Sequence, residues 1–269
     1  MYQLAGGVSL QAISECRRHF FLEMNQSAQL PSHLYLELAC MLEEYRSNNP
    51  KRLVMEAVSP KLQEVGPMNF AWFHCQKAIL ATIHGMHHDA IQFADTMRSG
   101  APSPFIPLDM RVGTVLCVAL SAIAVARQTE NSQVTHPNVG RGWRCARLRL
   151  ARRYHGMLKK LSKSATDLCL GKAYLVEAEL LSQSARPKDR ARCLLLYKSA
   201  IGVATKAGNL LDEALANEWA AKFSLRSKKW HDKEQGLDFL VDAIDAFDRW
   251  GAVVKTRELR DQLTELRTA

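Results

Sequence analysis

One apolar pattern occurs twice in the C-terminal half of the chain, with steps of three, four and three residues. The copies are Leu194, Tyr197, Ile201 and Ala204, and Leu240, Ala243, Phe247 and Trp250. Such steps keep side chains on one face of an α-helix. Gly208 and Gly251, 43 residues apart, follow the two copies, so a helical unit repeats at an offset of 43 to 46 residues. The second copy also carries Leu237, Val241 and Ile244 as another stripe, and is expected to contact a neighbour on either side.

The helices that precede these two copies repeat as well. Ala178 and Leu181 stand 42 residues before Ala220 and Phe223. Alanine at a crossing lets two helix axes approach, and a large apolar residue one turn away fills the groove. Each unit is therefore expected to be a helix pair, with Trp250 buried between stacked pairs. A helical bundle without repeats is the alternative that such degenerate spacing leaves open.

The rest of the chain also has helical periodicity, and no segment has a convincing strand pattern. Ala78 and Ala90 are twelve residues apart across Gly85, the step between the two small positions of a tetratricopeptide unit. We therefore expect an all-α fold, a tetratricopeptide-like solenoid of helical hairpins. The expected organisation is irregular helical repeats in residues 1–127, a polar linker loop in 128–142 and tetratricopeptide-like repeats in 143–269.

Local signals place several helix ends. Ser164 is expected to cap the helix that begins at residue 165, and Asn209 is expected to cap a later one. Gly208 and Gly251 stand where a helix needs a left-handed residue after its last turn.

Two C-terminal segments resemble a known helical region. They are Glu213-Ala214-Leu215-Ala216-Asn217-Glu218-Trp219-Ala220-Ala221-Lys222-Phe223 and Ala246-Phe247-Asp248-Arg249-Trp250-Gly251-Ala252. With residues 174–180, residues 196–201 and Lys255, they are similar to the region that follows the nucleoside-triphosphatase module of large signalling proteins. Those proteins carry kinase-like, histidine-kinase or nucleotide-cyclase domains. The resemblance covers residues 143–267 well and the N-terminal half only in style.

In such proteins this region is a tetratricopeptide-like spacer and docking scaffold, and the resemblance implies the same role here. The nucleotide-binding module and the signalling domains are both missing from the 269 residues. The chain is therefore expected to be either a stand-alone scaffold or a fragment of a larger gene product.

Motifs for phosphate or nucleophile chemistry are missing. The sequence has no Gly-x-x-x-x-Gly-Lys-Ser/Thr loop and no Gly-x-Ser-x-Gly elbow. His84, His87 and His88 cluster, but only Asp89 is near in sequence as a further ligand. Adjacent side chains on a helix diverge by about 100°, so a solvated turn is favoured over a metal site. We expect no enzymatic activity, no cofactor and no metal.

The strongest surface signal is a run without acidic residues between Asn131 and Thr166. Its nine cationic residues equal the whole formal excess of +9. On a helical wheel one face carries Trp143, Ala146, Leu150, Tyr154, Met157 and Leu161. The opposite face carries the candidate residues for binding an acidic partner: Arg149, Arg152, Arg153, Lys159, Lys160 and Lys163. This pattern predicts an amphipathic helix with a concentrated cationic face.

Three interpretations of this face stay open. A solvated outer face is the commonest role of charged residues on a repeat helix. Binding to an acidic protein is the second, because densely packed like charges repel and gain from neutralisation. Nucleic acid or an anionic membrane is the third, although no aromatic residue lies among the cations for base stacking.

The cysteines and the apolar segments indicate a compartment. Seven cysteines are scattered without a Cys-x-x-Cys pair, which suits core thiols in a reducing environment. The first residues lack the features of a secretory signal. The apolar run Val112 to Ala126 has fifteen residues, whereas a membrane span needs about 20, so a buried helix is favoured. We expect a cytoplasmic protein without a membrane span.

Together these patterns predict a non-catalytic helical-repeat scaffold for protein–protein interaction, or for interdomain coupling in a signalling ATPase, kinase or cyclase. Its expected partners are a protein with an acidic surface or flanking ATPase and signalling domains. One alternative is a fragment of a catalytic signalling ATPase or nucleotide cyclase whose active domains lie outside the chain. The other is a nucleic-acid-binding protein that uses the basic helix 141–163.

Overall fold

The computed structural model describes residues 67–99, 108–131, 141–183, 186–227 and 229–268. Its helices are α5 (Pro67–Ile83), α6 (His87–Ser99), α7 (Leu108–Asn131), α8 (Arg141–Leu161), α9 (Thr166–Leu181), α10 (Pro187–Lys206), α11 (Leu210–Leu225), α12 (Trp230–Trp250) and α13 (Val253–Thr268). These ranges contain no strand, which confirms the all-α class. The repeats expected in residues 1–66 lie outside the described residues.

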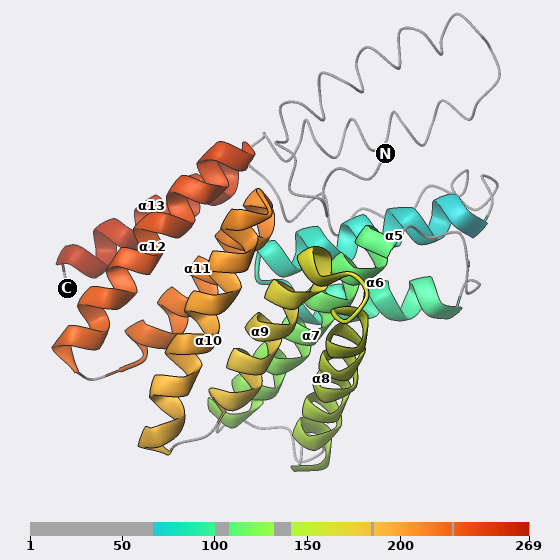
Figure 1. Cartoon of the computed structure of the whole chain (residues 1–269), viewed down its shortest axis with the longest axis horizontal. Coiled ribbons are helices and arrows are strands. Elements are labelled where there is room, and N and C mark those ends of the chain that lie inside the picture. Colours follow the sequence, from blue (N-terminus) through green and yellow to red (C-terminus); the bar gives the residue numbers. More distant parts are fainter. Residues whose placement is uncertain (1–66, 100–107, 132–140, 184–185, 228, 269) are drawn as a thin grey trace, which may run out of the picture.

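The helices are arranged in chain order. Each described helix packs against the next one along the chain, and α7 also packs against α5 and α9. Figure 1 shows α8 to α12 lying side by side in chain order across the molecule, with α5 reaching back toward the upper end of α11. Connections between neighbours are short at positive-φ glycines: Gly85 (φ 73°), Gly208 (φ 66°) and Gly251 (φ 89°). The predicted left-handed residues at Gly208 and Gly251 are therefore confirmed.

One hydrophobic core runs through the array from α5 to α13. Alanines that occupy it are fully buried, among them Ala178, Ala220 and Ala243. Trp250 has none of its surface exposed, which confirms its predicted burial. Among the described cysteines, four are buried and Cys145 is exposed. The core therefore depends on close helix crossings as well as on large apolar side chains.

Two glycines lie at crossings where no side chain fits easily. A methyl group at Gly236 of α12 would lie 2.8 Å from Cγ of Leu225 on α11. One at Gly171 of α9 would lie 3.2 Å from Cγ1 of Val203 on α10. In both helix pairs the absent side chain lets the two backbones approach. No described atom lies within 4 Å of such a methyl group at Gly202, by contrast.

Several predicted boundaries need correction. Asn209 caps α11 by accepting a hydrogen bond from the amide of Asp212 (3.1 Å), as predicted. The predicted Ser164 cap is wrong. The Ser164 hydroxyl donates to the carbonyl of Leu161 (3.2 Å) at the end of α8, and α9 begins without a side-chain cap.

The expected linker 128–142 is too long, because α7 continues to Asn131 and α8 begins at Arg141. Residues 128–131 are polar but include no glycine or proline, so they allow α7 to extend.

The α5–α6 turn contacts helices far along the chain. Nδ1 of His84 lies 3.6 Å from a carboxylate oxygen of Glu258 on α13. The ring of His87 lies 5.9 Å from the ring of Trp219 on α11. Both histidines are largely shielded from solvent, with 3% of the His84 side chain and 8% of His87 exposed. The expectation of a solvated turn is therefore wrong for His84 and His87, which pack against the C-terminal helices, whereas Gly85 and His88 are exposed as expected.

Candidate functional site: the cationic face of helix α8

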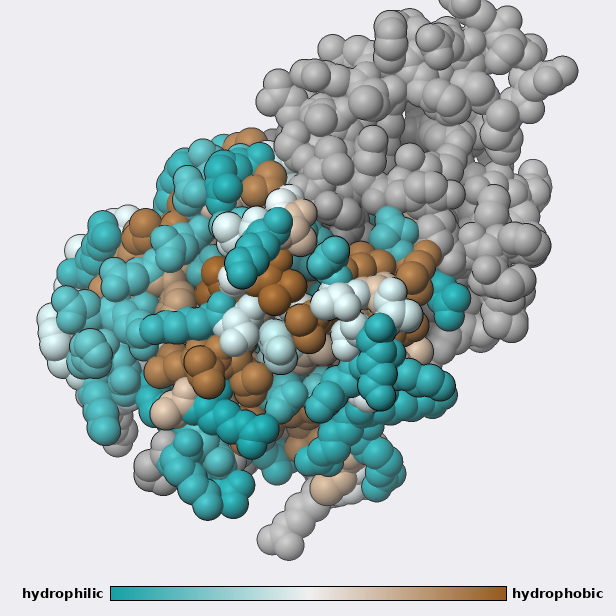
Figure 2. Space-filling view, viewed as in Figure 1, coloured by the Kyte–Doolittle hydropathy of each residue, from teal (hydrophilic) through white to brown (hydrophobic). Residues whose placement is uncertain are grey.

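The six predicted cationic residues lie together on the surface. Arg149, Arg152, Arg153, Lys159 and Lys160 are on α8, and Lys163 is in the turn after it; all six are exposed. The opposite side of α8 buries Leu148, Ala151, Tyr154 and Leu158 in the core. Figure 2 shows mostly hydrophilic side chains over the region where α8 lies. The structure thus brings together all six residues singled out in the sequence.

The buried side of α8 differs from the predicted one. Ala146 and Met157, expected on the apolar face, are exposed, whereas Leu148 and Ala151 are buried. Packing against α7 and α9 determines which side of the helix is covered, and the two neighbours cover a side rotated from the predicted stripe. The cationic side still points away from the core, because it lies opposite Leu148 and Ala151.

Most of these cations have no partner within the described chain. Nζ of Lys159 lies 3.9 Å from a carboxylate oxygen of Glu177. The same carboxylate accepts a hydrogen bond from Nη2 of Arg192 (3.0 Å) and lies 3.5 Å from Nε2 of His155. The other five have neither an ion pair nor a side-chain hydrogen bond among the described residues: Arg149, Arg152, Arg153, Lys160 and Lys163. Helix α8 carries no acidic residue to neutralise them. Their positive charge is therefore open to an external partner.

Aromatic groups near this face are already engaged. The ring of Trp143 stacks on His88 at 5.9 Å and is covered by the guanidinium of Arg147 at 4.8 Å from its centroid. Tyr154 is buried. The described cationic face therefore offers charge without an exposed aromatic ring for stacking a base.

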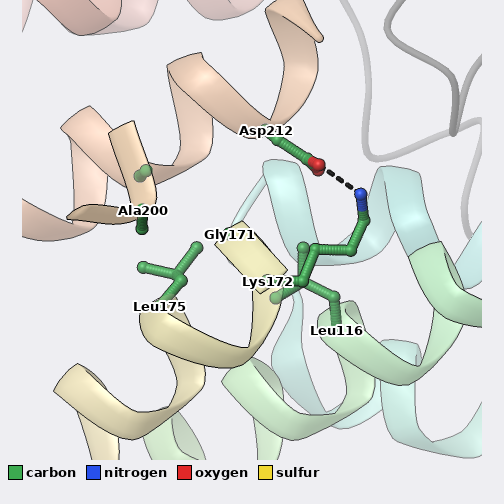
Figure 3. Close-up of a pocket in the computed structure, with 7 residues that line it drawn as sticks. Leu116, Gly171, Lys172, Leu175, Ala200 and Asp212 are labelled. Carbon is green, nitrogen blue, oxygen red and sulfur yellow. Dashed lines mark hydrogen bonds and ion pairs between the residues drawn. The ribbon is translucent and has the colours of Figure 1, made fainter. Parts of the chain in front are cut away.

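Buried charges inside the array form a second set of polar contacts, which the sequence analysis did not identify. Nζ of Lys172 on α9 donates to the carboxylate of Asp212 on α11, and Lys172 is 1% exposed. Figure 3 shows this side chain reaching past Leu116 toward Asp212. The hollow beside the pair, also lined by Gly171 and Leu175, leaves no space for a water molecule. This junction is therefore a structural contact between helices.

A second buried contact joins α7, α9 and α10. Both oxygens of the fully buried Glu179 carboxylate accept hydrogen bonds, one from the Tyr197 hydroxyl and one from Nη2 of Arg127 (2.8 Å). Arg127 also donates to the hydroxyl of Ser182 (2.9 Å). Burial and the carboxylate raise the pKa of Tyr197 well above its usual value, so the hydroxyl stays protonated and remains a donor.

A third buried contact joins α11 to α13. An oxygen of Glu218 accepts from Nζ of Lys222 (2.7 Å) and from Nζ of Lys255 (2.8 Å). Burial raises the pKa of Glu218, but the two ammonium groups outweigh it and hold this pKa at about 2.

Burial, helped by nearby Lys222, lowers the pKa of His87 to about 4, so its ring is neutral at pH 7. Its Nδ1 lies 3.2 Å from the hydroxyl of Ser121.

The described helices offer no metal site and one candidate for a membrane span. Across the described ranges no three histidine, cysteine or carboxylate side chains are placed to hold one ion. One described helix, over Leu108–Gln128, is long and apolar enough to cross a membrane, with mean hydropathy 1.8. Core helices share this length and composition, and 78% of its most apolar stretch is buried. That burial favours a core helix.

Comparisons of the chain with protein-family models, with curated proteins and with solved structures find no match. The resemblance to the helical region of signalling ATPases therefore depends on the quoted residues alone and stays a prediction.

Proposed function

We propose that this chain is a non-catalytic, tetratricopeptide-like scaffold that binds an acidic protein surface through the cationic face of α8. One observation carries the proposal: five exposed cations on and just after one helix have no partner among the described residues. Exposed like charges at this density repel one another, and an acidic partner relieves that repulsion on binding. Coupling of flanking signalling domains is the wider role that the sequence resemblance implies.

The arrangement of helices supports the scaffold part of the proposal. Successive helices pack in chain order, and α5, α7 and α9 contact one another in turn. This is the pattern in which hairpins stack into a solenoid and each unit contacts chiefly its neighbours. Gly208 and Gly251, at equivalent ends of α10 and α12, support a repeated unit. Such arrays present extended helix faces to partners.

An acidic protein is favoured over nucleic acid by the composition of the face. Stacking of bases on aromatic rings is a large part of binding to single strands, at about 1–3 kcal/mol per base. Trp143, the aromatic residue closest to the cations along α8 apart from buried Tyr154, is already stacked on His88. The cationic face instead carries a single large exposed apolar side chain, Met157 (37% exposed). Charges around one apolar residue match the rim and centre of a protein interface.

Fluorescence anisotropy with a labelled Glu-rich peptide tests the proposal. The test variant reverses four cations on α8: Arg149→Glu, Arg152→Glu, Arg153→Glu and Lys160→Glu. The control variant makes the same change in net charge at exposed lysines elsewhere: Lys188→Glu, Lys198→Glu, Lys206→Glu and Lys233→Glu. We expect the α8 variant to bind at least about tenfold more weakly than the control, and wild-type binding to weaken with added salt.

Two results would contradict the proposal. Equal loss of binding in both variants would mean that only overall charge matters. Tighter binding of a labelled oligonucleotide than of the peptide, abolished by the α8 variant alone, would assign the face to nucleic acid.

A further inference from the structure

The outer face of α12 has the opposite charge to α8. Asp238, Asp242 and Asp245 are all exposed and lie one turn apart along the helix. Asp238 and Asp242 have no ion pair among the described residues, and Asp245 accepts from Nε of Arg249 (2.9 Å). Partial burial and the neighbouring carboxylates raise the pKa of Asp242. These acidic groups repel one another just as the cations of α8 do.

Between its outer charges, each face has one large exposed apolar residue at a matching position. On α8, Met157 follows Arg153 by four residues and precedes Lys160 by three. On α12, Val241 follows Asp238 by three residues and precedes Asp245 by four. Met157 is 37% exposed and Val241 41%, although the sequence predicted that Val241 contacts a neighbouring repeat.

These two patterns are complementary when the helices lie antiparallel. Asp245 then faces Arg153, Val241 faces Met157, and Asp238 faces Lys160. The outer charges are seven residues apart on both helices, about 10.5 Å at 1.5 Å per residue, so both pairs form at once. The register that aligns the charges therefore also aligns the two apolar residues.

The middle of this register is favourable too. Gly156 of α8 faces Asp242. No described atom lies within 4 Å of the position that a Cβ atom would take at that glycine. A glycine within a helix costs about 0.5–1 kcal/mol relative to alanine, and no contact inside the chain requires it. Arg249 would face Arg149, but it already binds Glu213 (2.9 Å) and Asp245. Arg149 and Arg249 are the one pair of like charges that this register brings together, and the acidic partners of Arg249 already neutralise part of that charge.

The two faces belong to different parts of one molecule. Figure 1 shows α8 and α12 on opposite sides of the helical array, with α9, α10 and α11 between them. A contact between them therefore requires two molecules. We propose that the cationic face of α8 docks antiparallel on the acidic face of α12 of a second copy of this chain. This inference rests on the proposed function, for which it names the acidic partner.

The contact joins two different surfaces, so it leaves one cationic and one acidic face free in every dimer. Such a contact adds further copies unless the geometry closes a ring. Exposed ion pairs are worth about 0–1 kcal/mol each, so the association is expected to be weak and sensitive to salt.

Sedimentation velocity on two charge-reversed variants tests the proposal. The first variant carries Arg153→Glu and Lys160→Glu, and the second carries Asp238→Lys and Asp245→Lys. We expect the wild type to associate at low salt and to dissociate as salt is added. Each variant alone should be monomeric, because the paired positions of α8 and α12 then carry like charges. Mixing the two variants should restore association, since each face again meets its opposite.

A chain with all four reversals provides the internal control. It should associate, because the charges at both paired positions are opposite again, whereas a loss of fold would prevent this recovery. A wild type that stays monomeric at low salt, or variants that fail to associate on mixing, would overturn the inference.

The outcome is distinguishable from failure of the proposed function. If the wild type is monomeric but still binds the Glu-rich peptide through α8, the cationic face serves another acidic protein and only the self-association is refuted. If the chain associates as expected but the peptide does not bind, the α8 face is specific for α12 and the general acidic-partner proposal fails.

Discussion

Replacing Gly236 by alanine tests the close crossing of α11 and α12. In an open helical position, alanine is more stable than glycine by about 0.5–1 kcal/mol, because glycine loses more backbone entropy on folding. At Gly236 the new methyl group would lie 2.8 Å from Cγ and 3.1 Å from the backbone nitrogen of Leu225. Leu225 would have to move, and overpacking of this kind costs about 1–3 kcal/mol. The net expectation is a protein about 1 kcal/mol less stable.

Gly202 is the matched control, because it also lies within a helix and a methyl group there would contact no described atom within 4 Å. Gly202→Ala should stabilise the protein by about 0.5–1 kcal/mol. The assay is urea unfolding followed by circular dichroism, with the midpoint compared at a constant slope. The two variants should differ by about 2 kcal/mol with opposite signs. Equal stabilisation by both would refute the close approach at Leu225.

Three other predictions concern buried groups. Trp250→Ala should lower the free energy of unfolding by about 3–5 kcal/mol, measured in denaturant, and a loss below about 1 kcal/mol would contradict its burial. Lys172→Met should cost about 3 kcal/mol, because it leaves the Asp212 carboxylate, 14% exposed, with Asn209 as its remaining side-chain partner, and adding Asp212→Leu should recover most of that loss. Because burial lowers the pKa of His87 to about 4, the unfolded chain binds this proton first, so stability should fall between about pH 6.5 and 4. His87→Gln should flatten that part of the stability–pH profile, and an unchanged profile would contradict the assignment.

The sequence predicted features that depend on local rules. Asn209 can cap a helix whatever surrounds it, and Gly208 and Gly251 allow a left-handed turn that other residues rarely adopt. The exposed cations of α8 were also predictable, because no acidic residue lies nearby in the chain. These features needed no knowledge of which helices pack together.

Features that depend on tertiary partners were not predictable in the same way. Nothing in the local sequence marks Lys172, Glu179 and Glu218 as buried, yet each is buried with a partner from another helix. Periodicity cannot pair residues 40 positions apart, such as Lys172 and Asp212. It also misplaced the buried side of α8, since the contact with α7 and α9 decides which side is covered.

The packing of the α5–α6 turn on the C-terminal helices has a consequence for how the molecule unfolds. Linear repeat arrays fray from their ends, because a terminal unit has a neighbour on one side only. Here His84 and Glu258, 174 positions apart, tie the first described helix pair to the last helix. Opening either end must break this tie, so the ends are expected to exchange their amide hydrogens together and not independently. The described array is therefore expected to unfold as one cooperative unit.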